Sequence, residues 1–343
     1  MAQRGRFGFF VVVSILATMT ASCGGGSTGG STGAPRSPSV TSSASTSAPG
    51  PASLPTIASV PVGGEPIGIV AGFGSLWVVN SEAFSGGMPS LSRIDPSTNA
   101  VTATIPVGAL PLEVTTGFGS VWVSNSEDDT VSRIDPSTNQ VVATIEVCKA
   151  PEGFAAGAGS MWVVCEQSGA VGRIDPASNR MRGVVKVGRE PRFATFAFAS
   201  VWVANYDDST VSRIDPSKEK VTATVSTDFG CQVITAFDGT IWVSNAGSDT
   251  VQRIDPDTEK IVATIDTDLS PDGMLALDGA MWVASEIGPE LTRVDVSTNT
   301  VNGTYQVSDQ GSINANQLLA QIDGALWFPL FDSATVLRVS VPS

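Results

Sequence analysis

Histidine is absent from all 343 residues of this sequence. Because histidine is the usual general acid–base group and a common zinc ligand, its absence excludes Ser-His-Asp nucleophiles, histidine-based proton transfer and His-ligated zinc. Any catalysis would have to use carboxylates, lysine, tyrosine, serine or cysteine.

Basic residues are also scarce. The sequence has 19 Lys and Arg against 33 Asp and Glu, so its formal net charge is −14. Binding to a nucleic-acid backbone needs Lys and Arg to neutralise phosphates, and no basic stripe is present, so we expect no nucleic-acid partner. An anionic membrane surface would also repel the chain, so we expect contact with a membrane only through a covalent lipid anchor.

The N-terminus has the features of an export signal. Two arginines precede an apolar segment, residues 7–16, which is too short to span a bilayer as a stable anchor. The small residues Thr20-Ala21-Ser22 before Cys23 resemble the lipobox of bacterial lipoproteins. This resemblance implies that residues 1–23 are a lipoprotein signal peptide, that Cys23 is lipidated, and that the protein faces the extracytoplasmic side of the cell membrane. Ordinary secretory cleavage near Cys23 is the alternative.

Residues 24–54 consist mainly of Gly, Ser, Thr, Ala and Pro with one charge, Arg36. Such a segment buries too little apolar surface to offset the entropy lost on ordering. We therefore expect a disordered linker, followed by a folded domain at residues 55–343.

Tryptophan recurs at regular intervals in that domain. The spacings are 45, 40, 40, 40, 40 and 45 residues between Trp77, Trp122, Trp162, Trp202, Trp242, Trp282 and Trp327. Within one period, short β-type runs at 113–116, 121–124, 130–135 and 141–145 are separated by turn residues. A period of about 40 residues with four strands per unit predicts an all-β, seven-bladed β-propeller with four-stranded antiparallel blades.

The seventh unit predicts how the ring closes. Residues 317–343 contain only three strands, whereas residues 56–63 resemble an outer strand such as 102–108. We therefore expect residues 56–62 to complete blade 7, which leaves no unpaired edge between the first and last blades.

An arginine recurs once per unit like the tryptophan, in the third strand. We interpret both as scaffold: the tryptophan packs between blades, and the guanidinium bonds carbonyls or the nearby Asp. Features shared by all blades hold the fold, so function should lie where the blades differ.

One position does differ between blades. The residue after the proline, or its equivalent, that precedes each innermost strand is in turn Ile67, Leu112, Glu152, Arg192, Gln232, Asp272 and Gln317. We expect this position to lie at the channel mouth, where Glu152, Arg192, Gln232, Asp272 and Gln317 form a candidate ligand-binding site. Water-bridged lining of the channel is the alternative. No metal ligands are assigned.

Blade length differs as well. Residues 81–90 and 308–316 each contain five extra residues, and both connections should emerge on the same face of neighbouring blades. Two interpretations of these insertions stay open: a raised rim over the channel mouth, or variation in loop length that the fold tolerates.

Three cysteines follow Cys23. Cys148 precedes blade 3 and Cys165 ends its second strand, so an exported protein could join them in a disulfide. Cys231 would then be left over.

Two family resemblances follow from these motifs. Leu76-Trp-Val-Val-Asn80, Val123-Ser-Asn125 and Ser132-Arg-Ile-Asp-Pro136 resemble YVTN/YncE-like seven-bladed propellers of bacterial surfaces and periplasm. Asp323-Gly-Ala-Leu-Trp-Phe328 and Val171-Gly-Arg-Ile174 look like blade motifs of streptogramin B lyases, which include virginiamycin B lyase. Those enzymes open a cyclic depsipeptide by elimination with histidines, a glutamate and magnesium, and the histidines have no counterpart here.

These observations favour a monomeric, lipid-anchored extracytoplasmic propeller that binds a small molecule or envelope protein at one channel mouth without catalysis. No cofactor is required, although a divalent cation is possible. The alternative is a lyase or lactonase-type hydrolase that uses carboxylates, with Glu152, Glu166 or Glu286 as substitutes for the missing histidines, and a divalent cation.

Overall fold

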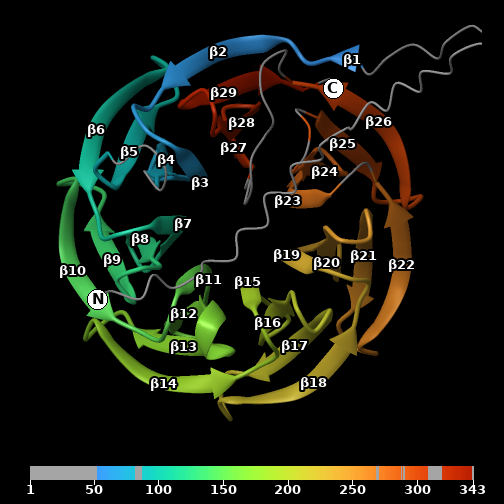
Figure 1. Ribbon diagram of the computed structural model, residues 1–343. Helices are drawn as coiled ribbons and strands as arrows, with labels where there is room; N and C mark the ends of the chain where they lie inside the picture. The colour runs from blue at the N-terminus through green and yellow to red at the C-terminus, as the bar shows by residue number, and fades with distance from the viewer. Residues whose placement is uncertain are drawn as a thin grey trace, which may run out of the picture. The chain divides into compact units, whose positions relative to one another are not determined.

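The protein was analysed as a computed structural model that describes residues 52–81, 87–267, 270–286, 288, 290–307 and 319–341. The chain divides into two units, residues 1–48 and 49–343. The predicted signal peptide and residues 24–51 of the predicted linker lie outside the described residues. Within the second unit the described residues form seven sheets arranged as a ring (Figure 1), so the predicted all-β, seven-bladed propeller is confirmed.

The first three blades each run from the innermost to the outermost strand in chain order. They are formed by β3 (Pro66–Gly72), β4 (Ser75–Asn80), β5 (Ser90–Asp95) and β6 (Ala100–Pro106); β7 (Pro111–Gly117), β8 (Ser120–Asn125), β9 (Thr130–Asp135) and β10 (Gln140–Glu146); and β11 (Pro151–Gly157), β12 (Ser160–Cys165), β13 (Ala170–Asp175) and β14 (Arg180–Lys186).

The next three blades repeat this order. They are formed by β15 (Pro191–Ala197), β16 (Ser200–Asn205), β17 (Thr210–Asp215) and β18 (Lys220–Ser226); β19 (Cys231–Phe237), β20 (Thr240–Asn245), β21 (Thr250–Asp255) and β22 (Lys260–Asp266); and β23 (Pro271–Leu277), β24 (Ala280–Ser285), β25 (Glu290–Asp295) and β26 (Thr300–Gln306).

Blade 7 joins the two ends of the domain. Its strands from C-terminal sequence are β27 (Ala320–Ile322), β28 (Ala325–Leu330) and β29 (Thr335–Ser340), and its outer strand is β2 (Thr56–Pro61). β2 pairs antiparallel with β29, with Val60 opposite Val336. The predicted closure by the N-terminal strand is therefore confirmed, and Figure 1 shows β2 outside β29.

A short strand precedes this closure. β1 (Ala52–Ser53) pairs in parallel with β26 of blade 6, and the Leu54 amide donates to the Gln306 carbonyl at 3.0 Å. Leu54 is buried, in one apolar cluster with Phe328 of blade 7. Residues 52–54 are thus ordered on the propeller, three residues before the predicted boundary at 55. The sequence did not predict that residues 52–54 are ordered, because their composition is that of the linker.

The core lies between the blades. The second strand is buried along its whole length, as in β8, whereas the outer strand β10 is mostly exposed apart from Ile145. Each tryptophan is at most 1% exposed. Trp77 of blade 1, for example, packs in one cluster with Val121 and Val123 of blade 2. Large apolar side chains are thus removed from water by the neighbouring blade, which is why a single unit cannot fold alone.

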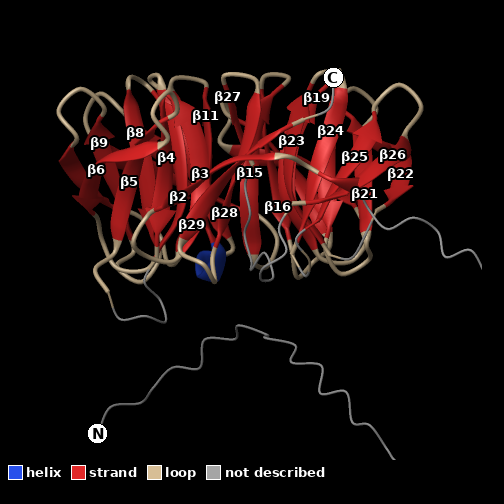
Figure 2. Ribbon diagram, turned by 90° about the horizontal axis from the view of Figure 1, so that it is seen from above, coloured by secondary structure: helices blue, strands red, loops and turns tan. Residues whose placement is uncertain are grey.

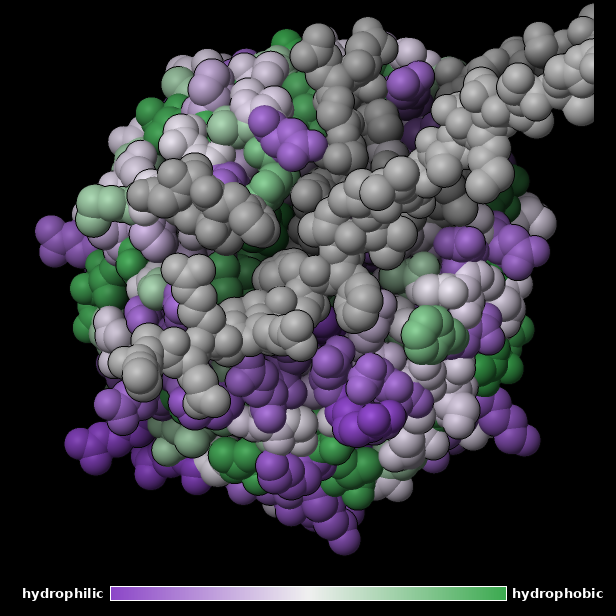
Figure 3. All heavy atoms as spheres, viewed as in Figure 1, coloured by the Kyte–Doolittle hydropathy of each residue, from purple (hydrophilic) through white to green (hydrophobic). Residues whose placement is uncertain are grey.

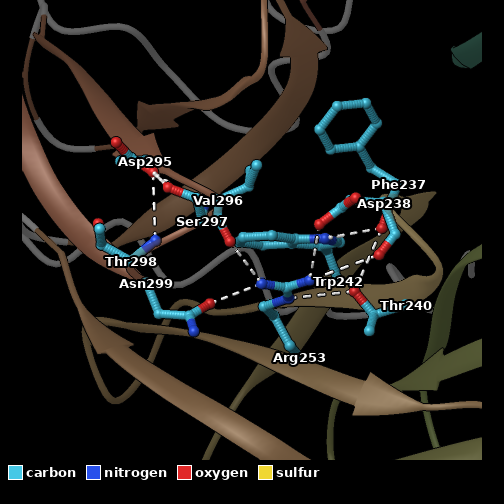
Figure 4. Close-up of polar contacts among 10 residues, drawn as sticks. All are labelled: Phe237, Asp238, Thr240, Trp242, Arg253, Asp295, Val296, Ser297, Thr298 and Asn299. Carbon is cyan, nitrogen blue, oxygen red and sulfur yellow. Dashed lines mark hydrogen bonds and ion pairs between the residues drawn. The ribbon is translucent and has the colours of Figure 1, made fainter.

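Within the described residues, the recurring arginine of six of the seven blades bonds the next blade, as Figure 4 shows for Arg253. The Arg253 guanidinium lies 4.7 Å from the Trp242 ring centroid and donates to the Val296 carbonyl at 2.8 Å and to Asn299 Oδ1 at 2.7 Å. Equivalent bonds lead from Arg93 to the Pro136 carbonyl and from Arg338 of blade 7 to the Pro96 carbonyl of blade 1. These are bonds to the next blade, which a repeat pattern alone does not reveal.

The repeated aspartate has another role than the predicted bond to arginine. Asp295 Oδ1 accepts the Ser297 amide at 2.8 Å, and Asp95 and Asp135 make the same bond to the residue two positions on. These carboxylates therefore stabilise the turn between the third and fourth strands, where Asp favours bonds to nearby backbone amides.

Among the residues that the structure describes, no helix is long and apolar enough to span a membrane.

Candidate functional site

Two kinds of connection define the two faces of the ring. Loops such as 126–129 and connections between blades such as 147–150 lie on one face, here called the crossing face. Hairpins such as 118–119 and turns such as 136–139 lie on the other, here called the hairpin face. Figure 2 shows the ring side-on, with connections gathered at both ends of the strands.

Each innermost strand from β3 to β23 begins with a bulge at the crossing face. In blade 2, Pro111 pairs with Asn125 and Val114 with Val123, so Leu112 and Glu113 both lie opposite Ser124. Ser124 Oγ accepts the Glu113 amide at 3.1 Å. Bulges re-aim side chains and are enriched next to functional sites. The position that varies between blades is therefore a bulge residue.

The bulge residues of neighbouring blades contact one another. Arg192 Nη1 lies 3.2 Å from Glu152 Oε1, which joins blades 3 and 4. Gln232 Nε2 donates to Asp272 Oδ1 at 2.9 Å, which joins blades 5 and 6. Glu152 is 1% exposed and Asp272 is fully buried. Four of the five predicted site residues are thus paired between adjacent blades, and Gln317 lies outside the described residues.

Further groups surround Arg192. Its Nη2 lies 3.4 Å from Glu166 Oε1 and 3.7 Å from Glu190 Oε2, and its guanidinium lies 5.3 Å from the Tyr206 ring centroid. Glu166 belongs to the 3-10 helix η1 (Glu166–Ser168), drawn in blue in Figure 2. Glu152 contributes most to raising the pKa of Arg192 above its ordinary value, so this guanidinium is a permanent cation.

Hydrophilic side chains gather on this face over blades 3 and 4, at the lower centre of Figure 3. The ion pairs of Arg189 with Asp207 and Asp208 belong to this region, as do the contacts of Arg192. Sequence reasoning missed Glu190 and Tyr206, because they lie in loops whose approach to Arg192 depends on the ring.

Glu113 is a further residue that sequence reasoning missed. It is 3% exposed, and burial, followed by the charges of Glu152 and Asp272, raises its pKa well above the ordinary value despite a bond from the Val114 amide. The carboxylates of Glu113 in blade 2, Glu152 in blade 3 and Asp272 in blade 6 therefore influence one another electrostatically at the crossing-face ends of the innermost strands. The sequence did contain a signal for Glu113, because the equivalent position is acidic only in blade 2. In other blades it is occupied by Gly68, Gly153, Phe193, Val233 or Gly273.

Among the residues that the structure describes, two buried carboxylate oxygens have no hydrogen-bond partner. They are Oε2 of Glu113 and Oε2 of Glu152. The other oxygen of each is bonded, to the Val114 amide at 2.9 Å and to Arg192 at 3.2 Å. Leaving a buried polar atom unsatisfied costs about 1–3 kcal/mol, so such atoms are usually explained by a ligand, a water or a functional role.

The ionisation of Glu152 should make stability depend on pH. Burial, opposed by Arg192 and reinforced by Glu166, raises the pKa of Glu152 from 4.5 to about 7. The folded state then holds more protons than the unfolded state, so the free energy of unfolding should fall as pH rises from about 5 to 8. Urea unfolding across this range measures the slope, and Glu152→Gln should make it shallower.

Asp278→Asn is the matched control for this experiment, because it changes a carboxylate in a hairpin turn on the opposite face, at a positive φ that asparagine tolerates. Equal slopes for the wild type and Glu152→Gln would contradict the assignment.

No group of three Cys, Asp or Glu side chains among the described residues is arranged to hold a metal ion. Of the two predicted insertions, 81–90 and 308–316, residues 82–86 and 308–316 lie outside the described residues, so the raised rim remains a prediction.

A disulfide joins Cys148 and Cys165, with Cα atoms 5.6 Å apart, and Cys231 is a buried free cysteine. The bond ties the connection from blade 2 to the second strand of blade 3, beside the strand that begins Pro151-Glu152. It therefore anchors the backbone that presents Glu152.

Removing this disulfide should destabilise the domain by about 3 kcal/mol, since it closes a sequence separation of 17 residues. The double variant Cys148→Ala, Cys165→Ala tests this in urea unfolding. Under denaturing conditions, reduction should expose two additional thiols in the wild type and in Cys231→Ala, but none in the double variant. No increase in the wild type would contradict the pairing.

A cleft of about 510 Å³ opens on the hairpin face between blades 3 and 4. It is lined by Phe196 and Phe198 together with Arg213, whose guanidinium is already bonded to the Pro256 carbonyl and Glu259. Its polar groups thus serve the contact between blades, whereas the crossing-face mouth retains unsatisfied ones.

Fold and site together define a seven-bladed β-propeller with a buried polar cluster at the crossing-face ends of its innermost strands. No protein-family model matches the sequence, and no curated protein matches it significantly. Among solved structures, similar chains occur in hydrazine synthase of Kuenenia stuttgartiensis (15% identity, TM-score 0.70, 81% of this chain and 96% of that chain covered). A streptogramin B lyase and virginiamycin B lyase from Staphylococcus aureus are each 17% identical with a TM-score of 0.69, and each alignment covers 81% of this chain and 94% or 95% of theirs. At these identities the similarity establishes the fold alone.

Proposed function

We propose that this chain is a lipid-anchored, extracytoplasmic propeller that binds a small molecule or an envelope protein at its crossing-face mouth without catalysis. The binding residues are Glu113, Glu152, Arg192, Gln232 and Asp272, with Gln317 as a further candidate. The monomeric state and YVTN/YncE-like membership belong to the same proposal.

One observation carries this function: two blades have a buried apolar residue where the others have a polar one. Blades 1 and 2 place Ile67 and Leu112 at the same bulge position, where both are buried. Burying charged groups instead is costly unless they are paired, and replacing buried ion pairs by apolar residues is often neutral or stabilising. Glu152 and Asp272 at this position are therefore better explained by a ligand than by stability.

A screen for ligand-induced stabilisation tests the function. A ligand that binds only the folded state raises the melting temperature, whatever its chemistry. We would screen divalent cations, sugars, cyclic peptides, amines and quinones against the protein, and repeat each positive result with Arg192→Ala and Asp272→Asn. The shift should disappear in Asp272→Asn, change in size in Arg192→Ala, and persist unchanged in Asp278→Asn on the hairpin face. Shifts that both substitutions leave unchanged would refute this site.

The anchor is tested separately through Cys23. Replacing Cys23 by Ser should release the protein from the membrane fraction and abolish incorporation of labelled fatty acid, since a lipid chain is the only membrane attachment in the proposal. Membrane association of Cys23→Ser equal to that of the wild type would contradict it.

A lyase or lactonase-type hydrolase is the second candidate, favoured by the pKa of Glu152 of about 7. A carboxylate with this pKa is suited to general acid–base catalysis near neutral pH. Chromatography of a streptogramin B depsipeptide and of simple lactones after incubation with the protein would detect ring opening. Turnover that is lost in Glu152→Gln would replace the non-catalytic proposal, and absence of turnover would support it.

A further inference from the structure

We propose that the ligand of the crossing-face mouth is an organic cation, a protonated amine or a guanidinium, held by the carboxylates of Glu113, Glu152 and Asp272. This inference rests on the proposed function and specifies its ligand class.

The first argument is the set of unsatisfied atoms. Three buried atoms of described site residues lack a partner: the acceptors Oε2 of Glu113 and Oε2 of Glu152, and the donor Nε of Arg192, so acceptors outnumber donors. Only a donor group satisfies an ionised carboxylate. Charge-assisted bonds from a cationic N–H group are roughly twice as strong as neutral ones, so a cationic donor offsets the cost of burying these groups best.

The second argument is the charge balance of the mouth. Arg192 is already shared by Glu152, Glu166 and Glu190, at 3.2 to 3.7 Å. Asp272 of blade 6 adds to the negative field at Glu113. Carboxylates thus outnumber the guanidinium groups. An anionic ligand would be repelled, whereas a cation would be attracted before it reaches the binding groups.

The third argument separates organic cations from metal ions. Metal ions need ligand oxygens that converge to within about 2.0–2.6 Å of one centre. The described residues contain no group of three with such an arrangement. An N–H group of an organic cation donates to an oxygen about 2.7–2.9 Å from its nitrogen, so the accepting oxygens lie further apart than metal ligands do. A guanidinium has five such N–H groups in one plane. Carboxylates spaced around a channel therefore suit a nitrogen cation better.

Binding should be coupled to proton release. Glu152 is faced by Arg192, Glu166 and Glu190, and Glu113 by Glu152 and Asp272. Burial raises the pKa of Glu152 to about 7, so part of its population is protonated at neutral pH, and burial also raises the pKa of Glu113. A bound cation favours the ionised forms. Affinity for a cation should therefore rise as pH rises through about 7, the pKa of Glu152.

Isothermal titration calorimetry with butylammonium and butylguanidinium tests the inference, with butanol as the neutral probe and Mg²⁺ as the metal probe. We expect saturable binding of at least one organic cation at pH 8. At pH 7 the apparent binding enthalpy should differ between Tris and phosphate buffers, because the released protons are taken up by buffers of different ionisation enthalpy. Affinity should be about tenfold weaker at pH 6, because the ionised fraction of Glu152 falls about tenfold. Butanol and Mg²⁺ should bind at least tenfold more weakly than the organic cation.

Two variants test whether the carboxylates of Glu113 and Glu152 bind the cation. Glu113→Gln with Glu152→Gln keeps the shape and removes both charges, and should weaken cation binding at least tenfold, whereas Asp278→Asn should leave it unchanged. Circular dichroism and melting temperature verify that each variant is folded. If the double variant failed to fold, the single Glu113→Gln variant would be used with the same expectation of weaker binding. Equal binding by wild type and Glu variants would overturn the inference.

The outcomes separate this inference from the function on which it rests. One outcome is that neither cation binds while a neutral or anionic ligand stabilises the wild type and not Asp272→Asn. That result would overturn the inference of a cationic ligand and leave the binding function in place. If no compound of any class acted through Arg192 or Asp272, both would fail.

Discussion

Deleting residues 55–63 is expected to abolish cooperative folding of the propeller. The deletion removes β2 (Thr56–Pro61), the outer strand of blade 7, and leaves the edge of β29 unpaired. It also removes Val60 and Val62, which are 2% and 7% exposed and pack with Trp327 and Val336. Burying a valine contributes about 1.5–3 kcal/mol. Together with the lost strand pairing, this approaches the whole stability of about 5–15 kcal/mol that is typical of a folded domain.

The measurement is thermal unfolding by circular dichroism together with gel filtration. We expect loss of the cooperative transition, and aggregation through the exposed strand edge. A deletion of equal length, residues 24–32, lies in the Gly-, Ser- and Thr-rich segment and should leave melting unchanged. Unchanged melting of the 55–63 deletion would remove the closure model.

Replacing Arg253 by Ala is expected to destabilise the domain by about 3 kcal/mol. The side chain is 9% exposed, stacks on Trp242, and donates to Val296 and Asn299 of the next blade. The substitution removes the cation–π contact and leaves those acceptors without their donor, and each such buried loss costs about 1–3 kcal/mol. Urea unfolding measures the change.

Arg182→Ala is the matched control. Its side chain is 59% exposed and pairs with Asp175, and exposed ion pairs contribute about 0–1 kcal/mol. Arg253→Lys should fall between the two, because lysine keeps the charge but lacks the planar set of donors. Equal losses in Arg253→Ala and Arg182→Ala would refute a structural role for the guanidinium between blades.

The architecture was predictable because it follows from a period. Seven tryptophans at nearly equal spacing, with turn residues between short strands, specify seven similar units, and residues 56–62 could be matched to the missing outer strand by likeness alone. The structure confirms both points. Repetition makes this possible, since each unit carries the same local preferences and buries its apolar face only against a neighbour.

The candidate site was predictable in part. The bulge residues Glu152, Arg192, Gln232 and Asp272 stood out because they replace the isoleucine and leucine of blades 1 and 2. The sequence did not reveal which would pair. It also missed Glu113, one position further, because alignment of the units did not show that a bulge turns two consecutive residues away from regular pairing.

Other features depended on the closed ring. The end of the predicted linker forms β1 against β26, some 250 residues later in the chain, and composition carries no information about such a contact. The acceptors of Arg93 and Arg253 lie 43 and 46 residues further on, in the next blade, and those of Arg338 lie 239 and 242 residues earlier, in blade 1.

The sequence by itself therefore determined the strand period, the number of blades and the strand that closes them, because these depend on local patterns repeated along the chain. Only the tertiary structure decided which charged groups share the channel mouth, which of their oxygens stay unsatisfied, and how burial shifts the pKa of Glu113 and Glu152. Those properties depend on distances between side chains of different blades and on exclusion of water, and neither is encoded in any single repeat.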